Sequence, residues 1–236
     1  GSLIYTVGGF AYGGKDGNVS VSNSVVVYDS SSDTWEILSS MPYIEGSNGE
    51  ESLSVAFCGG QRVEINGGNY IYMFGGINDA SVSIEELKVK NYNKRIIRYH
   101  IESDTWEYSD VLRSDELNYY QRISPLSLVV GSKIIVFNGA IEDGNFMVYP
   151  SDNFYINITE QFLDAELDGR WTFYESEFSK GFPSPKFQSA MVSYSSNPSS
   201  GEKDSYYIFG GSNEESDSLD IVEKIENYGT ISYSSS

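Results

Sequence analysis

An eight-residue phrase occurs twice in this chain, as YDSSSDTW at residues 28–35 and as YHIESDTW at residues 99–106. A phrase that returns in this way indicates an internal repeat, and a repeat determines the architecture of the whole chain. A short apolar segment that ends in glycine recurs with the same long period. It occurs as LIYTVGG, YIYMFGG, KIIVFNG and YYIFGG. This pattern therefore predicts one structural unit that is repeated four times along the chain.

Each full repeat contains four candidate strands separated by turn signals. The glycine segment is followed by a segment closed by Tyr and then by one that opens with Trp, and the later repeats have a further segment before the glycine strand. These preceding segments are SLSVAF at 52–57, PLSLVV at 125–130 and PKFQSAMVSY at 185–194. No helical periodicity of useful length is present. The pattern predicts an all-β fold, because a four-stranded antiparallel sheet repeated about an axis is a blade of a β-propeller.

A strand ending in Gly-Gly, then a Tyr, then a Trp about seven residues later, resembles the kelch repeat. The resemblance covers nearly the whole chain and implies kelch-type blades at about 3–42, 52–112, 124–176 and 185–236 of a single propeller domain or propeller fragment. The residues that carry it are expected to be structural: Gly8, Gly9, Tyr28, Trp35, Gly75, Gly76, Tyr99, Trp106, Gly139, Trp171, Gly210 and Gly211. The third repeat departs by Asn138 in place of the first glycine and by an insertion before Trp171, and the fourth has no Trp.

The two ends of the repeat array do not match. The first repeat lacks the strand that should precede its glycine strand, and the fourth stops before its Trp. Kelch propellers commonly have six blades, so we expect the chain to be part of a larger propeller completed by another segment or a second chain. The alternative is a compact four-bladed ring.

Charge and hydropathy exclude several partners. Fifteen Lys and Arg against thirty-four Asp and Glu give a formal net charge of −19, which repels nucleic acid and anionic membrane surfaces. No apolar run approaches the roughly 18 residues that a membrane span needs. The family resemblance implies a cytoplasmic location, whereas the acidity and low Lys content would also suit a secreted or surface protein.

The sequence offers little for catalysis. It has a single histidine, His100, which we expect in a turn, and a single cysteine, Cys58, which we expect in the core. Acidic pairs fall in loop-like segments: Glu50-Glu51, Glu85-Glu86, Glu142-Asp143 and Glu214-Glu215. We therefore predict no catalytic residue, no metal site and no cofactor. The alternative is a carbohydrate-active or isomerase-type propeller enzyme with a site at the central channel.

The predicted function is a non-catalytic scaffold that binds a protein or peptide partner through propeller loops. These loops lie near 12–18, 78–95, 142–152 and 212–217 after the glycine pairs, and near 43–51, 110–122 and 175–185 between blades. One basic segment is a candidate site for an acidic or phosphorylated partner, and its residues are Lys88, Lys90, Tyr92, Lys94, Arg95 and Arg98. Pairing of these cations with the protein's own carboxylates is the alternative.

Overall fold

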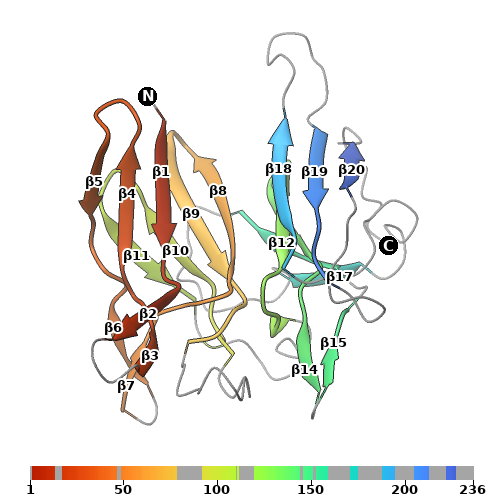
Figure 1. Ribbon diagram of the computed structural model, residues 1–236, viewed down its shortest axis with the longest axis horizontal. Helices are drawn as coiled ribbons and strands as arrows, with labels where there is room; N and C mark the ends of the chain where they lie inside the picture. Colours follow the sequence, from red (N-terminus) through yellow and green to blue (C-terminus); the bar gives the residue numbers. More distant parts are fainter. Residues whose placement is uncertain are drawn as a thin grey trace. The chain divides into compact units, whose positions relative to one another are not determined.

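The computed structural model describes the chain in several stretches, and its elements there are the strands β1 to β20 (Figure 1). The described residues are 2–13, 18–46, 49–78, 92–109, 111, 120–143, 146–150, 153–158, 171–174, 188–194, 205–212 and 222–226. The chain divides into two compact units: unit 1 is Gly1–Ile123 with Thr159–Glu166, and unit 2 is Ser124–Ile158 with Leu167–Ser236. That both units belong to one propeller domain stays a prediction.

Unit 1 contains two antiparallel sheets and two hairpins. The first sheet, blade 1, has three strands in the order β1 (Leu3–Val7), β4 (Val25–Asp29) and β5 (Thr34–Ile37). The second, blade 2, has four strands in the order β11 (Thr105–Tyr108), β10 (Ile97–His100), β9 (Gly68–Phe74) and β8 (Gly59–Ile65). The hairpins are β2 (Phe10–Gly13) with β3 (Asn18–Val21), and β6 (Tyr43–Gly46) with β7 (Gly49–Ser52).

Unit 2 repeats this plan. Blade 3 has the order β12 (Leu126–Val130), β13 (Lys133–Phe137), β16 (Asn153–Asn157) and β17 (Trp171–Tyr174). Blade 4 has three strands in the order β18 (Ala190–Tyr194), β19 (Ser205–Phe209) and β20 (Val222–Glu226). One hairpin joins β14 (Ile141–Asp143) to β15 (Phe146–Val148). The all-β class and the four blade-like sheets predicted from the repeats are thus confirmed.

The strands fall where the motifs predict, with one exception. The glycine segments are β1, β9, β13 and β19, the Tyr segments β4, β10 and β16, and the Trp segments β5, β11 and β17. The prediction of a strand at 52–57 was wrong, because the first strand of blade 2 is β8, which begins after it at Gly59. The carbonyl of Val55 accepts from the backbone N–H of Gly9, and Ala56 forms an isolated bridge with Ile77. The hydrogen bonds of this buried apolar segment therefore go to turns rather than to a ladder.

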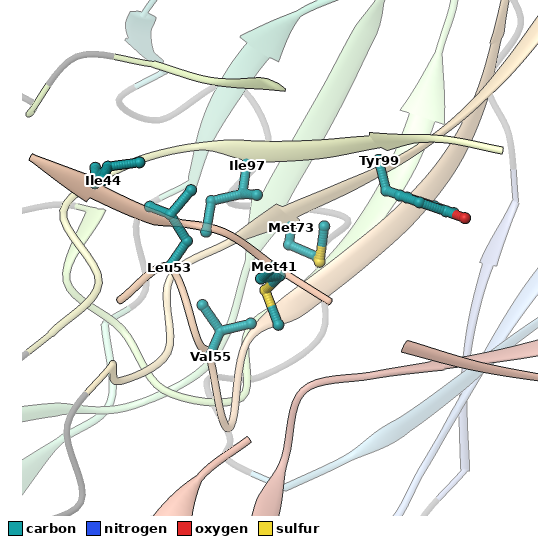
Figure 2. Packing of buried hydrophobic residues seen from close by; sticks show 7 residues of the cluster. All are labelled: Met41, Ile44, Leu53, Val55, Met73, Ile97 and Tyr99. Carbon is teal, nitrogen blue, oxygen red and sulfur yellow. The ribbon is translucent and has the colours of Figure 1, made fainter. Parts of the chain in front are cut away.

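The main core of unit 1 lies where blade 1 meets blade 2. Its buried members come from the segment between the two blades and from the strands of blade 2, and they are Met41, Ile44, Leu53, Val55, Met73, Ile97 and Tyr99 (Figure 2). Blade 1 adds Tyr5 and Val7 to this cluster. In unit 2 a second cluster joins blade 3 to blade 4 through residues such as Ile135 and Ile208. The two blades of each unit thus share one buried cluster, as the repeat architecture requires.

Candidate interaction surface

The glycine pairs form tight turns at the ends of the glycine strands β1, β9, β13 and β19. Both members of the first pair have positive φ, 66° at Gly8 and 90° at Gly9, and the same holds at the later pairs. At the third turn Asn138 has a φ of 57° beside Gly139. Asparagine tolerates the left-handed region better than most residues, so this departure from the motif leaves the turn intact.

Close backbone approach explains why one glycine of a pair is indispensable. A Cβ at Gly8 would lie 2.1 Å from the carbonyl oxygen of Val55, and a Cβ at Gly76 would lie 2.4 Å from that of Ala56. Residues 53–56 therefore run between the glycine turns of blade 1 and blade 2. Only the absence of a side chain lets this segment link the two turns.

Two hairpins project from this glycine end of unit 1 (Figure 1). The β2–β3 hairpin starts at Phe10, directly after Gly9, and the β6–β7 hairpin ends at Ser52, where the connecting segment begins. The Phe10 ring packs edge-on against Phe57, with ring centroids 5.1 Å apart. We call these two hairpins the hairpin surface. It contains the strands that flank the first post-glycine loop and the first inter-blade loop, and a binding role for these loops stays a prediction.

The hairpin surface presents apolar and acidic groups together. Phe10 is 42% exposed and Tyr43 is 64% exposed. Glu45, two residues after Tyr43 on β6, is exposed as well.

The basic segment is mostly internal where the structure describes it. Lys88 and Lys90 lie outside the described residues. Tyr92 is buried and forms a bridge with Ile77, and Arg95 is buried and donates from Nη1 to the carbonyl of Ser109 over 2.8 Å.

Arg98 is 1% exposed and lies at the centre of a polar cluster. Its Nε donates to Glu107 over 2.5 Å and its Nη1 donates to the Tyr72 hydroxyl over 3.0 Å. Only Lys94 of the four described residues is exposed. Arg98 therefore follows the alternative of pairing within the protein, and a partner-binding role for Lys94 stays a prediction.

The duplicated phrase forms the same local structure twice. Tyr28 lies opposite Trp35 with ring centroids 4.8 Å apart, and its hydroxyl donates to Asp33 over 2.8 Å. In the second copy the Tyr99 and Trp106 rings are also 4.8 Å apart, and Tyr99 donates to Asp104 over 2.6 Å. These hydrogen bonds from Tyr99, and then from Ser39, lower the pKa of Asp104. The phrase forms a strand–turn–strand unit in both copies.

His100 lies at the end of β10, beside the turn that follows it. Its ring stacks on Tyr70, Nδ1 hydrogen-bonds Ser103 Oγ, and Nε2 lies 3.2 Å from Glu102. The Glu102 carboxylate also accepts from Asn69, which lowers its pKa. This histidine, serine and glutamate belong to a single exposed turn.

The first copy of this turn is held in a similar way without a histidine, because Asp29 accepts from Ser31. The His100 cluster therefore stabilises a turn. Burial raises the pKa of the Cys58 thiol to about 11, which keeps it protonated at neutral pH.

Within the described stretches, no three His, Cys, Asp or Glu side chains gather as a metal site would require. The same stretches contain no helix that is both long and apolar enough to cross a membrane. The acidic residues of Glu50-Glu51 and Glu142-Asp143 lie on β7 and β14, and the other two acidic pairs fall outside the described residues.

Comparison with known proteins agrees with this architecture. A family model described as "Kelch motif" matches residues 1–42, which span blade 1. The solved structure titled "Structure of YjhT" is similar with a TM-score of 0.51 at 17% sequence identity, over 89% of this chain and 56% of that one. This chain thus spans little more than half the length of that protein. No curated protein matches the sequence. The strands, the glycine turns and the motif match together define an all-β protein of the β-propeller class. Blade 1 carries a kelch motif.

Proposed function

We propose that this protein is a non-catalytic interaction scaffold that binds a protein or peptide through the hairpin surface. The observation that carries the proposal is the joint exposure of Phe10 and Tyr43 on two hairpins of unit 1. Exposed aromatic side chains on a fixed scaffold are favoured anchors for a partner, because they contribute a large apolar area at low entropic cost.

The negative charge of this protein indicates that the partner is basic. The formal net charge is −19, and Glu45 of the β6–β7 hairpin is exposed. A peptide or domain that carries Lys or Arg beside an apolar residue would satisfy both features of this surface. Such charge pairing acts mainly on the association rate and is screened by salt.

Affinity enrichment with the purified chain tests the proposal. The double variant Phe10→Ser/Tyr43→Ser should lose partners that the wild-type chain retains, and these partners should elute as salt is raised from 0.05 M to 0.5 M. Val222→Ser is a matched control, because Val222 is an apolar residue that is 62% exposed like Tyr43 but lies on β20, outside the hairpins. Retention of the same partners by the double variant, or their loss in the control alone, would contradict the proposal.

A further inference from the structure

The β6–β7 hairpin has an unpaired backbone edge on its β6 side. β6 and β7 form a two-stranded sheet, and among the residues that the structure describes no third strand pairs with β6. An unpaired strand presents a row of N–H and C=O groups to which an extended chain can bind. The hydrogen bonds of the hairpin determine which residues of β6 present these groups.

The pairing register gives the direction of each backbone group of β6. The N–H of Leu53 donates to the carbonyl of Pro42 over 3.2 Å, so these two residues form a hydrogen-bonded pair next to the hairpin. Hydrogen-bonded and non-hydrogen-bonded pairs alternate along an antiparallel ladder, so the next pair, Tyr43 with Ser52, is not hydrogen-bonded. By the same alternation Glu45, two residues further on, is not bonded to β7 either. The N–H and C=O groups of Tyr43 and Glu45 therefore point away from β7.

Proline does not interrupt this outer edge. Pro42 has no N–H, but the donor that it lacks would lie on the β7 side of the ladder, opposite Leu53. Tyr43 and Glu45 each keep one donor and one acceptor on the outer edge. An antiparallel strand placed there would exchange two hydrogen bonds with each of these residues. The outer edge of β6 can therefore accept an added strand, which is a known mode of peptide recognition.

The side chains of the same residues indicate which strand fits. Ile44, between them, is 7% exposed and anchors β6 in the main core of unit 1. Tyr43 is 64% exposed, and Glu45 is also exposed. Opposite charges, and aromatic residues beside β-branched ones, stabilise a cross-strand pair. A strand with Lys or Arg opposite Glu45 and an apolar residue opposite Tyr43 meets both conditions.

A second copy of this chain is a poorer occupant of the edge. Pairing of β6 with β6 of another copy would bring together two chains that each carry a formal net charge of −19. It would also offer Glu45 no cation, because β6 contains none. Charge therefore favours a basic segment of a different protein.

We propose that the outer edge of β6 binds an extended basic segment of a partner protein, which adds to the β6–β7 hairpin as a strand. The segment runs antiparallel to β6, with a cation opposite Glu45 and an apolar residue two positions later, opposite Tyr43. This inference rests on the proposed function, since it states how the hairpin surface holds its partner. It adds that recognition uses the backbone of Tyr43 and Glu45 as well as exposed side chains.

Peptide selection followed by amide hydrogen exchange tests the proposal. A displayed library of random peptides is selected on the wild-type chain, and the selected peptides should carry Lys or Arg two positions before an apolar residue. Exchange is then followed by NMR with and without a selected peptide. The amides of Tyr43 and Glu45 should exchange several-fold more slowly when the peptide is bound. The amide of Ile44, which already faces β7, is the internal control and should not change.

Two substitutions separate the contribution of the backbone from that of the charge. Glu45→Gln removes the carboxylate and keeps the N–H, whereas Glu45→Pro removes both. We expect Glu45→Gln to weaken peptide binding several-fold at low salt only, because salt screens the charge pair. Glu45→Pro should weaken binding further at every salt concentration, because it also removes a hydrogen-bond donor.

N-methylation of the peptide makes the same test without a change in the protein. A methyl group on the amide of the cation or of the apolar residue should abolish binding, because these amides face β6. A methyl group on the amide between them should leave binding unchanged, because that amide faces away.

The outcomes distinguish this proposal from the proposed function. Binding that tolerates Glu45→Pro and every N-methylation, but is lost in Phe10→Ser/Tyr43→Ser, would retain the hairpin surface and reject strand addition. Binding that also survives the double variant would contradict both. Selection of no peptide beyond those that the Glu45→Pro chain selects would overturn strand addition. A chain that dimerises and becomes monomeric on Glu45→Pro would assign the edge to a second copy, which would also overturn it.

Discussion

Trp106 donates its indole Nε1–H to the carbonyl oxygen of Ser39 at 2.9 Å, across 67 residues of sequence. This contact joins the outer strand of blade 2 to the segment that leaves blade 1. The tryptophan of the repeated phrase therefore acts between blades as well as within its own blade. The Tyr and the Asp of the same phrase position it, since Tyr99 packs on Trp106 and bonds to Asp104.

Removal of the Asp104 carboxylate should weaken the joint between the two blades. We expect Asp104→Ala to lower the free energy of unfolding by about 1 to 2 kcal/mol, the low end for hydrogen bonds to a charged group, because the carboxylate lies near solvent. Asp33→Ala should cost less, because the hydrogen bond that Asp33 accepts comes from Tyr28 of its own blade. Urea unfolding followed by fluorescence measures both. Equal losses in the two variants would show that the bonds to Ser39 contribute nothing.

The same carboxylate predicts a pH dependence. Hydrogen bonds from Tyr99 and Ser39 lower the pKa of Asp104 below its ordinary value of 3.8, so the folded state holds this proton less tightly than the unfolded state. The stabilisation is present above that ordinary value and is lost as the pH falls through the lower, folded value. We expect stability to fall below about pH 4 and to fall less steeply in Asp104→Asn. Unfolding curves at pH 7 and pH 3 test this, and an unchanged slope in the variant would exclude Asp104 as a contributor.

The two glycines of the first turn should respond differently to substitution. Gly9→Ala introduces a side chain at a φ of 90° into open space, and should cost about 1 to 2 kcal/mol from backbone strain. Gly8→Ala adds a collision with the Val55 carbonyl at 2.1 Å, and should cost about 1 to 3 kcal/mol more. Thermal or chemical unfolding of the two variants gives the comparison. If Gly9→Ala proved the more damaging, the close approach of the connecting segment could not be what the motif preserves.

Arg98 should not tolerate lysine. The guanidinium donates from Nε to Glu107 and from Nη1 to Tyr72, and a single ammonium group cannot reproduce that planar geometry. We expect Arg98→Lys to cost about 2 to 3 kcal/mol because polar groups in the interior lose their partners. Lys94→Ala, on the exposed side of the same segment, should stay within about 0.5 kcal/mol of wild type. A neutral Arg98→Lys would mean that the cluster around Glu107 is not structural.

Local chemistry explains why most of the fold could be predicted from the sequence. A glycine with φ above zero, and a Tyr and Trp paired across two strands, leave a signature in consecutive residues. The strand β8 could not be predicted in this way. Its sequence GGQRVEI is largely polar, whereas the apolar SLSVAF before it is buried between two turns. In this region the buried segment is not the paired strand. Hydropathy indicates which residues are buried, but it does not indicate which residues pair in a sheet.

The site was harder to predict because the sequence does not show whether a charged side chain points to solvent or into the interior. Five basic residues between Lys88 and Arg98 suggested a surface, yet Arg98 is interior. A signal was present in the repeat itself. Arg98 aligns with Val27 of the first copy, and Val27 is 7% exposed. A cation at a position that the other copy fills with a buried valine indicates an internal ion pair.

The exposed apolar side chains of blade 1, Trp35 and Ile37 among them, also affect how the chain behaves in concentrated solution. A net charge of −19 holds copies apart, and the range of that repulsion shrinks from about 30 Å at 0.01 M salt to about 3 Å at 1 M. In dilute buffer the faces that carry Trp35 and Ile37 are kept from meeting. Added salt removes that protection and strengthens the apolar attraction at the same time. We therefore expect the turbidity of a concentrated solution to rise with ionic strength.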